Sequence, residues 1–119
     1  MRVDSMGEYK SLIDGLVERS SSTKAEWVKN GQFPNTTENE AINKVLSSLS
    51  SEQKNVIAAL INDAKSSGIH DTLAYLSELQ NLNNLKISIN QEELPVEPFG
   101  TELNFDYAAR QSGDEWPEL

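Results

Sequence analysis

The helical pattern of this chain is strongest in residues 50–68, which read SSEQKNVIAALINDAKSSG. Apolar side chains recur there at three- and four-residue spacing, which places them on one face of a helix: Val56, Ile57, Leu60, Ile61 and Ala64. Ser50-Ser51-Glu52-Gln53 predicts the start of this helix, because it matches a capping box. Ser67-Gly68 predicts its end, since glycine accepts the left-handed conformation common at helix C-termini. We expect a central core helix here.

Three shorter helices are predicted before this one. The first runs from about Ser5 to Arg19 and has one apolar face: Met6, Tyr9, Leu12, Ile13, Leu16 and Val17. Thr23-x-x-Glu26 and Thr37-x-x-Glu40 are two further capping boxes, each opening a helix. Gly31 ends the second helix, and the third turns four apolar side chains inward: Ile42, Val45, Leu46 and Leu49.

After Gly68 the pattern predicts another helix and then a change of period. The helix carries Ile69, Leu73, Leu76 and Leu79, and Asp71 is its expected N-cap. Leu85, Ile87 and Ile89 alternate with polar residues, as in a half-buried strand. Asn90–Glu93 is the expected turn, Leu94–Val96 the expected return strand, and Thr101 the expected cap of a last helix that ends near Gln111.

These elements predict a helix-rich α+β fold, predominantly α. We expect a compact bundle of five to six short helices with one small β-hairpin near the C-terminal end. At 119 residues the chain is long enough for one core, so a single domain is expected over residues 1–119. Residues 1–4 are the candidates for disorder, and residues 113–119 are the expected irregular tail.

Charge excludes some classes of partner. Ten basic and nineteen acidic residues give a net charge of -9, which repels nucleic acid and anionic lipid. Residues 1–60 carry a net charge of -1 and residues 61–119 carry -8. The sequence contains no apolar run of membrane-spanning length and no signal peptide, so we expect a cytoplasmic protein without membrane contact.

Catalytic and cofactor motifs are absent from the sequence. The chain has no cysteine and one histidine, so a typical zinc site is excluded, and its isolated glycines form no phosphate loop. We therefore expect no metal, no cofactor and no catalytic residues. His70 stands next to Asp71, but adjacent helical residues point about 100° apart, so N-capping explains Asp71 better than a catalytic dyad does.

The C-terminal part gathers acidic and aromatic residues. From Asn90 onward Arg110 is the only cation of the sequence. One interpretation is an interaction surface for a basic partner, made of Glu92, Glu93, Glu97, Glu102, Asp106, Arg110, Asp114, Glu115 and Trp116. The other interpretation is structural: Phe99, Phe105 and Trp116 seal the core, while Arg110 pairs with Asp106 one turn away. Both hold if one face of the segment packs and the other binds.

Four motifs resemble a family of small bacterial proteins of unknown function. They are Gly68-Ile69-His70-Asp71, Glu93-Leu94-Pro95-x-Glu97-Pro98-Phe99-Gly100, Asp106-Tyr107-x-x-Arg110 and Gly113-Asp114-x-Trp116-Pro117. The resemblance covers most of the chain from about Tyr9. It implies a small single-domain protein and carries no active-site residue with it.

Two hypotheses of function follow. The first is a non-enzymatic interaction module, of the immunity or inhibitory type, that binds a basic protein through the acidic C-terminal half. The second is a small-molecule binder or weak hydrolase with a pocket between helices and hairpin, where His70, Asp106 and Arg110 would converge. Homodimerisation through the hairpin edge at Leu94–Val96 is compatible with either hypothesis.

Overall fold

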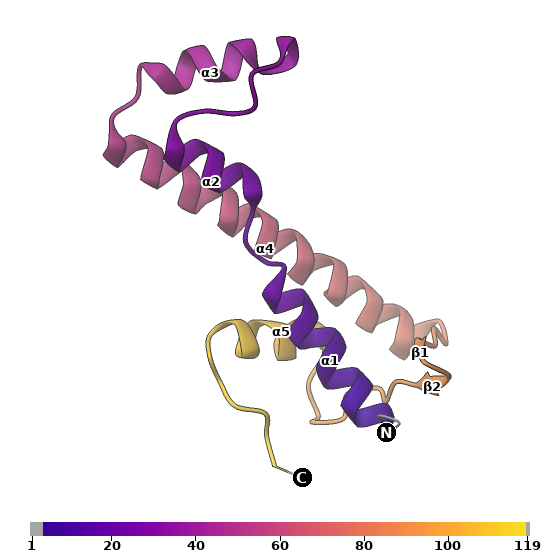
Figure 1. The fold of residues 1–119 in the computed structure, drawn as a ribbon. Coiled ribbons are helices and arrows are strands. Elements are labelled where there is room, and N and C mark those ends of the chain that lie inside the picture. The colour runs from indigo at the N-terminus through magenta and orange to yellow at the C-terminus, as the bar shows by residue number, and fades with distance from the viewer. Residues whose placement is uncertain (1–3, 119) are drawn as a thin grey trace. The chain divides into compact units, whose positions relative to one another are not determined.

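The computed structural model describes residues 4–118 and is mostly helical (Figure 1). Its contacts divide the chain into two compact units. Unit 1 consists of Met1–Arg19 and Gly68–Leu119, and unit 2 consists of Ser20–Ser67. Helix α4 (Ser51–Leu82) contributes its first part to unit 2 and its second part to unit 1.

Helix α1 (Ser5–Glu18) confirms the expected N-terminal helix to within one residue. The side chain of Asp4 caps it and accepts a hydrogen bond of 2.7 Å from the backbone N–H of Gly7. Of the residues expected to be disordered, 1–3 lie outside the described residues, and Asp4 has this defined role. Tyr9 and Ile13 are fully buried on the inner face of α1.

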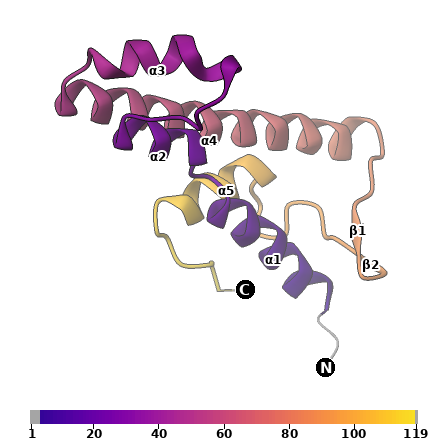
Figure 2. The same ribbon diagram turned by 45° about the horizontal axis from the view of Figure 1, so that its top comes forward.

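Helix α5 (Leu103–Gln111) packs against α1 in unit 1 (Figure 2). The core between the elements of this unit consists of Tyr9, Ile13, Leu73, Leu94, Leu103 and Tyr107. The expected capping role of Thr101 is wrong, because Glu102 occupies the N-cap position and makes no side-chain capping bond. The hydroxyl of Thr101 instead donates to the carboxylate of Asp106. The buried hydroxyl of Ser77 on α4 accepts the N–H of Leu103 at 2.9 Å.

The β-hairpin is present but begins its return earlier than expected. Strand β1 (Ser88–Ile89) pairs antiparallel with β2 (Glu92–Glu93), and Ile89 lies opposite Glu92. Asn90 and Gln91 between them have φ values of 52° and 67°, as in a two-residue type I′ turn. That turn usually shows an Asn-Gly pair, and here Gln91 stands in the place of the glycine. The position near the C-terminal end is also wrong, because the hairpin occupies residues 88–93 and α5 follows it.

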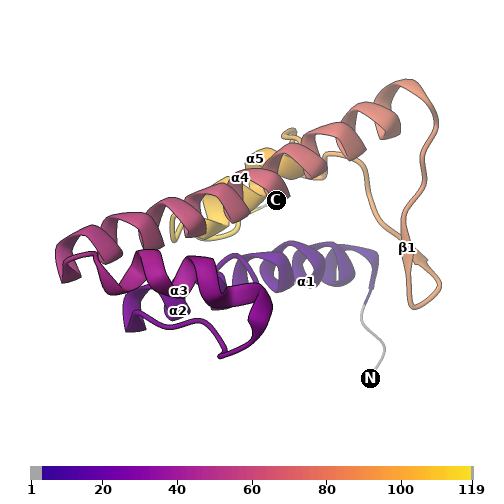
Figure 3. The same ribbon diagram turned by 90° about the horizontal axis from the view of Figure 1, so that it is seen from above.

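Unit 2 contains α2 (Thr23–Asn30), a 3₁₀ turn η1 (Thr37–Asn39), α3 (Glu40–Ser47) and the first part of α4 (Figure 3). Its core residues are Ala25, Val28, Leu46 and Ala58. Ser22, and not Thr23, caps α2, and α3 begins without a side-chain capping bond. Gly31 ends α2 as predicted, with a left-handed φ of 79°.

The expectation of five to six short helices is wrong, because of helix α4. It is one helix of 32 residues where the sequence predicted two. Its start is confirmed: Ser50 Oγ accepts the N–H of Gln53 at 3.1 Å, and Gln53 Oε1 accepts the N–H of Ser50 at 2.9 Å. Gly68 lies inside the helix and Asp71 caps nothing, so both boundary predictions there are wrong. An isolated glycine is tolerated within a helix, and no proline follows Gly68 to enforce an end.

The expected inward face of α4 is also wrong in part. Val56 and Leu60 are each 65% exposed, whereas Ala58 is fully buried. Ile57 and Ile61 pack against the unit 2 core. In α3 only Leu46 is buried, and Ile42 and Val45 are exposed. The run from Val56 to Ile61 is apolar on nearly every side, so periodicity alone does not decide which side is buried.

Candidate functional site

The net negative charge of the chain belongs to one of the two units. Unit 1 contains five basic and fourteen acidic residues, a net charge of -9, whereas unit 2 contains five of each. This division is sharper than the split between the two halves of the sequence, because unit 1 also includes the acidic α1. The long-range field of the net negative charge therefore originates in unit 1.

A buried carboxylate lies at the contact between α1 and α5. Asp106 is only 4% exposed. Its Oδ1 accepts a hydrogen bond of 2.5 Å from Thr101 Oγ1, and its Oδ2 accepts one from the hydroxyl of Tyr9. Burial raises the pKa of Tyr9, and the hydrogen bond to Asp106 and its negative charge raise that pKa further. Tyr9 therefore remains a hydrogen-bond donor at every physiological pH.

A second polar cluster joins α1 to the C-terminal segment. Arg110 Nε and Nη2 donate to the two carboxylate oxygens of Asp14 at 2.8 and 3.2 Å, and the indole N–H of Trp116 donates to Asp14 at 3.2 Å. Burial alone would raise the pKa of Asp14, but these hydrogen bonds and the charge of Arg110 lower it. The hydrogen bond to Asp14 raises the pKa of Arg110.

The expected pair between Arg110 and Asp106 is therefore wrong. Arg110 pairs with Asp14, which lies 96 residues away in sequence, because the Asp106 carboxylate points toward Tyr9 and Thr101. Sequence reasoning missed both Asp14 and Tyr9 as partners. Neither residue carries a local signal, since the contact between α1 and α5 is long-range.

Of the three C-terminal aromatic side chains expected to seal the core, two pack inward and one is exposed. Phe99 and Trp116 pack against the unit 1 core, and their stacked rings have centroids 5.4 Å apart. The Lys10 ammonium and the Arg110 guanidinium lie 5.8 and 4.9 Å from the centroid of Trp116. Phe105 is 58% exposed and seals nothing. One face of the segment therefore packs, and another is open.

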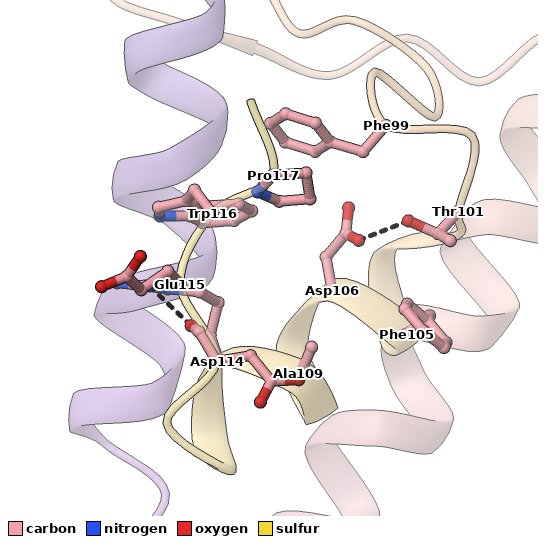
Figure 4. Close-up of a pocket in the computed structure, with 10 residues that line it drawn as sticks. Phe99, Thr101, Phe105, Asp106, Ala109, Asp114, Glu115, Trp116 and Pro117 are labelled. Carbon is pink, nitrogen blue, oxygen red and sulfur yellow. Dashed lines mark hydrogen bonds between the residues drawn. The ribbon is translucent and has the colours of Figure 1, made fainter. Parts of the chain in front are cut away.

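A hollow lies between α5 and the C-terminal segment and encloses about 150 Å³ (Figure 4). Its lining residues are Phe99, Thr101, Phe105, Asp106, Ala109, Arg110, Asp114, Glu115, Trp116 and Pro117. We call it the tail hollow. Two of the three residues expected to converge on a pocket, Asp106 and Arg110, line it together.

His70 does not line the tail hollow. It lies on α4, where its Nδ1 is 3.3 Å from Asp71 and both side chains are exposed. Asp106 and Arg110 are held by Tyr9, Thr101 and Asp14, so neither is placed as a general acid or base. Within residues 4–118, no three metal-ligating side chains gather.

Two further hollows continue the surface of unit 1 beyond the tail hollow. One, of about 300 Å³, is lined by Glu97, Gly100, Thr101, Glu102, Asn104 and Phe105. The other, of about 500 Å³, is lined by Ala74, Tyr75, Glu78, Asn81, Leu82 and Glu102. Phe105 is shared by the first of these and the tail hollow, and Glu102 is shared by the two further hollows. We call the three neighbouring hollows together the acidic groove.

The residues predicted for an interaction surface are only partly surface residues. Glu93, Glu102, Asp114 and Glu115 are exposed, while Glu92 and Glu97 are half-buried. Glu93 lies 3.9 Å from Lys86. Asp106, Arg110 and Trp116 belong to the internal contacts described above. Sequence reasoning did not find Tyr75, Glu78 and Leu82, because α4 presents them to solvent next to Glu102 only in the folded chain.

The hairpin edge proposed for dimerisation is partly occupied. Leu94 is buried, and its N–H donates to the carbonyl oxygen of Ile87 at 2.7 Å. Val96 is exposed. Dimerisation at this edge stays a prediction.

None of the helices in residues 4–118 combines the length and hydropathy that a membrane crossing requires.

Comparison with known proteins gives one relationship. No curated protein and no solved structure matches the chain. A family model matches residues 2–118, nearly the whole chain, in agreement with the resemblance of the four motifs. The chain belongs to this family, which is described as a family of unknown function (DUF6547).

Proposed function

We propose that this protein is a non-enzymatic interaction module that binds a basic segment of a partner protein in the acidic groove. The observation that carries the proposal is that the three hollows are neighbours on unit 1, since they share the lining residues Phe105 and Glu102. Carboxylates and exposed aromatic rings line these hollows together, since Tyr75 and Phe105 are each 58% exposed.

Charge supports a basic occupant. All the net charge of the chain belongs to unit 1, and the acidic groove is lined by six carboxylates and one cation: Glu78, Glu97, Glu102, Asp106, Asp114, Glu115 and Arg110. The cation is already paired with Asp14. Complementary fields of this kind accelerate encounter and exclude acidic competitors.

Exposed aromatic and aliphatic side chains give the acidic groove apolar surface that a partner can bury. Phe105 and Tyr75 are side chains of the kind that dominate binding energy when a partner removes them from water. Leu82 is also exposed at the same end of the groove. We therefore expect a partner segment that combines lysine or arginine with apolar residues.

The test uses a synthetic peptide of alternating lysine and leucine and a matched peptide of glutamate and leucine. The variant E97K/E102K reverses two groove charges, and E38K/E40K reverses two charges of unit 2 with the same change in net charge. We expect titration calorimetry to show binding of the lysine peptide only, with a large loss in E97K/E102K and a small loss in E38K/E40K. Phe105→Ala should weaken binding without changing its dependence on salt.

Equal losses of peptide affinity in E97K/E102K and E38K/E40K would mean that binding depends only on net charge, and the proposal would fail. Binding should also weaken between 0.1 M and 1 M salt, because the Debye length falls from about 10 Å to about 3 Å. Binding of the glutamate peptide would likewise contradict the proposal, as would a lysine peptide that binds the Phe105→Ala variant as tightly as the unchanged protein.

The volume of the tail hollow, about 150 Å³, gives no support to a separate drug-sized ligand, since such sites enclose about 300–1,000 Å³.

A further inference from the structure

The tail hollow has walls and a rim of different chemistry. Phe105, Ala109, Trp116 and Pro117 supply apolar walls, and Figure 4 shows the Trp116 and Pro117 rings across the hollow from α5. Asp114 and Glu115 are exposed acidic residues on the segment that closes the hollow on one side. An apolar interior beside two carboxylates matches a ligand with an aliphatic stem and a cationic end.

The remaining polar groups of the hollow are already engaged. Asp106 accepts hydrogen bonds from Tyr9 and Thr101. Arg110 donates to Asp14 and, through Nη1, to the backbone carbonyl of Asp114 at 2.8 Å. The hollow therefore does not offer a free cation to an anionic ligand, and its charge balance remains negative.

We propose that the tail hollow receives the side chain of a single lysine from the basic partner segment. The stem lies against Phe105, Ala109 and Trp116, and the ammonium group faces Asp114 and Glu115. This inference rests on the proposed function and deepens it, because it names the residue type that anchors the partner. The size fits: the hollow encloses about 150 Å³, and an apolar cavity of about that volume holds one benzene-sized group.

The test uses n-butylammonium as the stand-in for a lysine side chain and n-butanol as its uncharged counterpart. The readout is the pair of indole N–H signals in the ¹H–¹⁵N spectrum of the whole chain. Trp116 lines the hollow, while Trp27 lies in unit 2 against Phe33 and serves as the internal control. We expect n-butylammonium to shift the Trp116 signal saturably and leave the Trp27 signal in place. Butanol should bind at least about twofold to fivefold more weakly, as a lost ion pair at a surface site requires.

Two charge variants distinguish binding in the tail hollow from general electrostatic attraction to the chain. Glu115→Gln removes a rim carboxylate, and Glu118→Gln, three residues away and outside the hollow, removes the same charge. We expect Glu115→Gln to weaken n-butylammonium binding about twofold to fivefold and Glu118→Gln to leave it nearly unchanged. Ala109→Leu should fill the hollow and abolish the shift. Because Ala109→Leu could disturb folding, the pair of charge variants is sufficient by itself.

The outcomes distinguish this inference from the proposed function. If the lysine peptide binds in the acidic groove but n-butylammonium leaves Trp116 unchanged, the lysine site is wrong and the interaction module stands. If n-butylammonium binds but the peptide does not, the site stands as a cation site and the proposed function falls. Equal effects of Glu115→Gln and Glu118→Gln, or equal shifts from butanol, would overturn the lysine site.

Discussion

At the scale of single residues, the stability of unit 1 depends on two carboxylates held in different ways. Asp106 is buried and stabilised by two hydroxyl donors, whereas Asp14 is partly exposed and stabilised by a guanidinium and an indole. A buried carboxylate that loses a donor retains its desolvation penalty without compensation. The two sites therefore respond differently to mutation and to pH.

Tyr9→Phe should destabilise the protein by about 1–3 kcal/mol, because Asp106 would keep only the donor from Thr101. Chemical denaturation followed by circular dichroism measures the change. Tyr75→Phe is the matched control: Tyr75 is exposed, and a surface substitution usually changes stability by less than about 0.5 kcal/mol. Equal effects of the two variants would show that the Asp106 contact contributes nothing.

Asp14→Asn should lower stability at neutral pH by an amount that disappears in acid. The pKa of Asp14 is lowered from its ordinary value of 3.8 in the folded chain. The stabilisation is therefore fully present above the unfolded-state pKa and is lost as pH falls through the lowered folded-state pKa. Melting temperatures of the two proteins should converge as pH falls from neutral through 3.8 and then through the lowered folded-state pKa. A difference that stays constant over this range would mean that the Arg110 contact does not depend on the charge of Asp14.

At the scale of elements, the sequence predicted where helices occur better than where they stop. The reciprocal bonds between Ser50 and Gln53, and the left-handed Gly31, were predicted correctly because capping is local chemistry. Gly68 was mistaken for a helix end, because a glycine inside a helix looks the same as one after it. The hairpin shows a similar limit: its left-handed Asn90 and Gln91 lack the glycine that usually marks such turns.

Gly68→Ala should stabilise the protein by about 0.5–1 kcal/mol, because alanine is the better helix former. A Cβ at residue 68 meets no atom within 4 Å. Gly31→Ala is the contrasting variant: φ there is +79°, and the added Cβ would lie 2.9 Å from Lys54 Nζ. Thermal unfolding of both variants tests the continuity of α4, and a destabilised Gly68→Ala would restore the two-helix interpretation.

At the scale of the whole molecule, charge divides along the two compact units and not along the sequence. The C-terminal excess of acidic residues was visible in the sequence, and the acidic groove contains Glu97, Glu102, Asp114 and Glu115 from that set. The groove also needs Tyr75 and Glu78 from α4. No local pattern connects these residues to the C-terminal segment, because their proximity depends on the return of the chain after the hairpin.

Salt should stabilise the two units unequally. Raising salt from about 0.01 M to about 0.15 M shortens the Debye length from about 30 Å to about 8 Å, which weakens repulsion among the acidic residues of unit 1. Native-state hydrogen exchange should show slower exchange for amides of α1 and α5 and little change for those of α2 and α3. Equal slowing in all four helices would contradict the assignment of the repulsion to unit 1.

Unit 1 is assembled from two pieces of chain that flank residues 20–67, and this imposes an order in time. Asp14 leaves the ribosome 96 residues before Arg110, its partner. At about 5–20 residues per second, α1 waits roughly 5–20 s before α5 exists. Every residue of unit 2 is already synthesised by then. During that interval the apolar face of α1, with Tyr9 and Ile13, has no native partner from α5, so nascent chains of this protein are candidates for chaperone contact at their first helix.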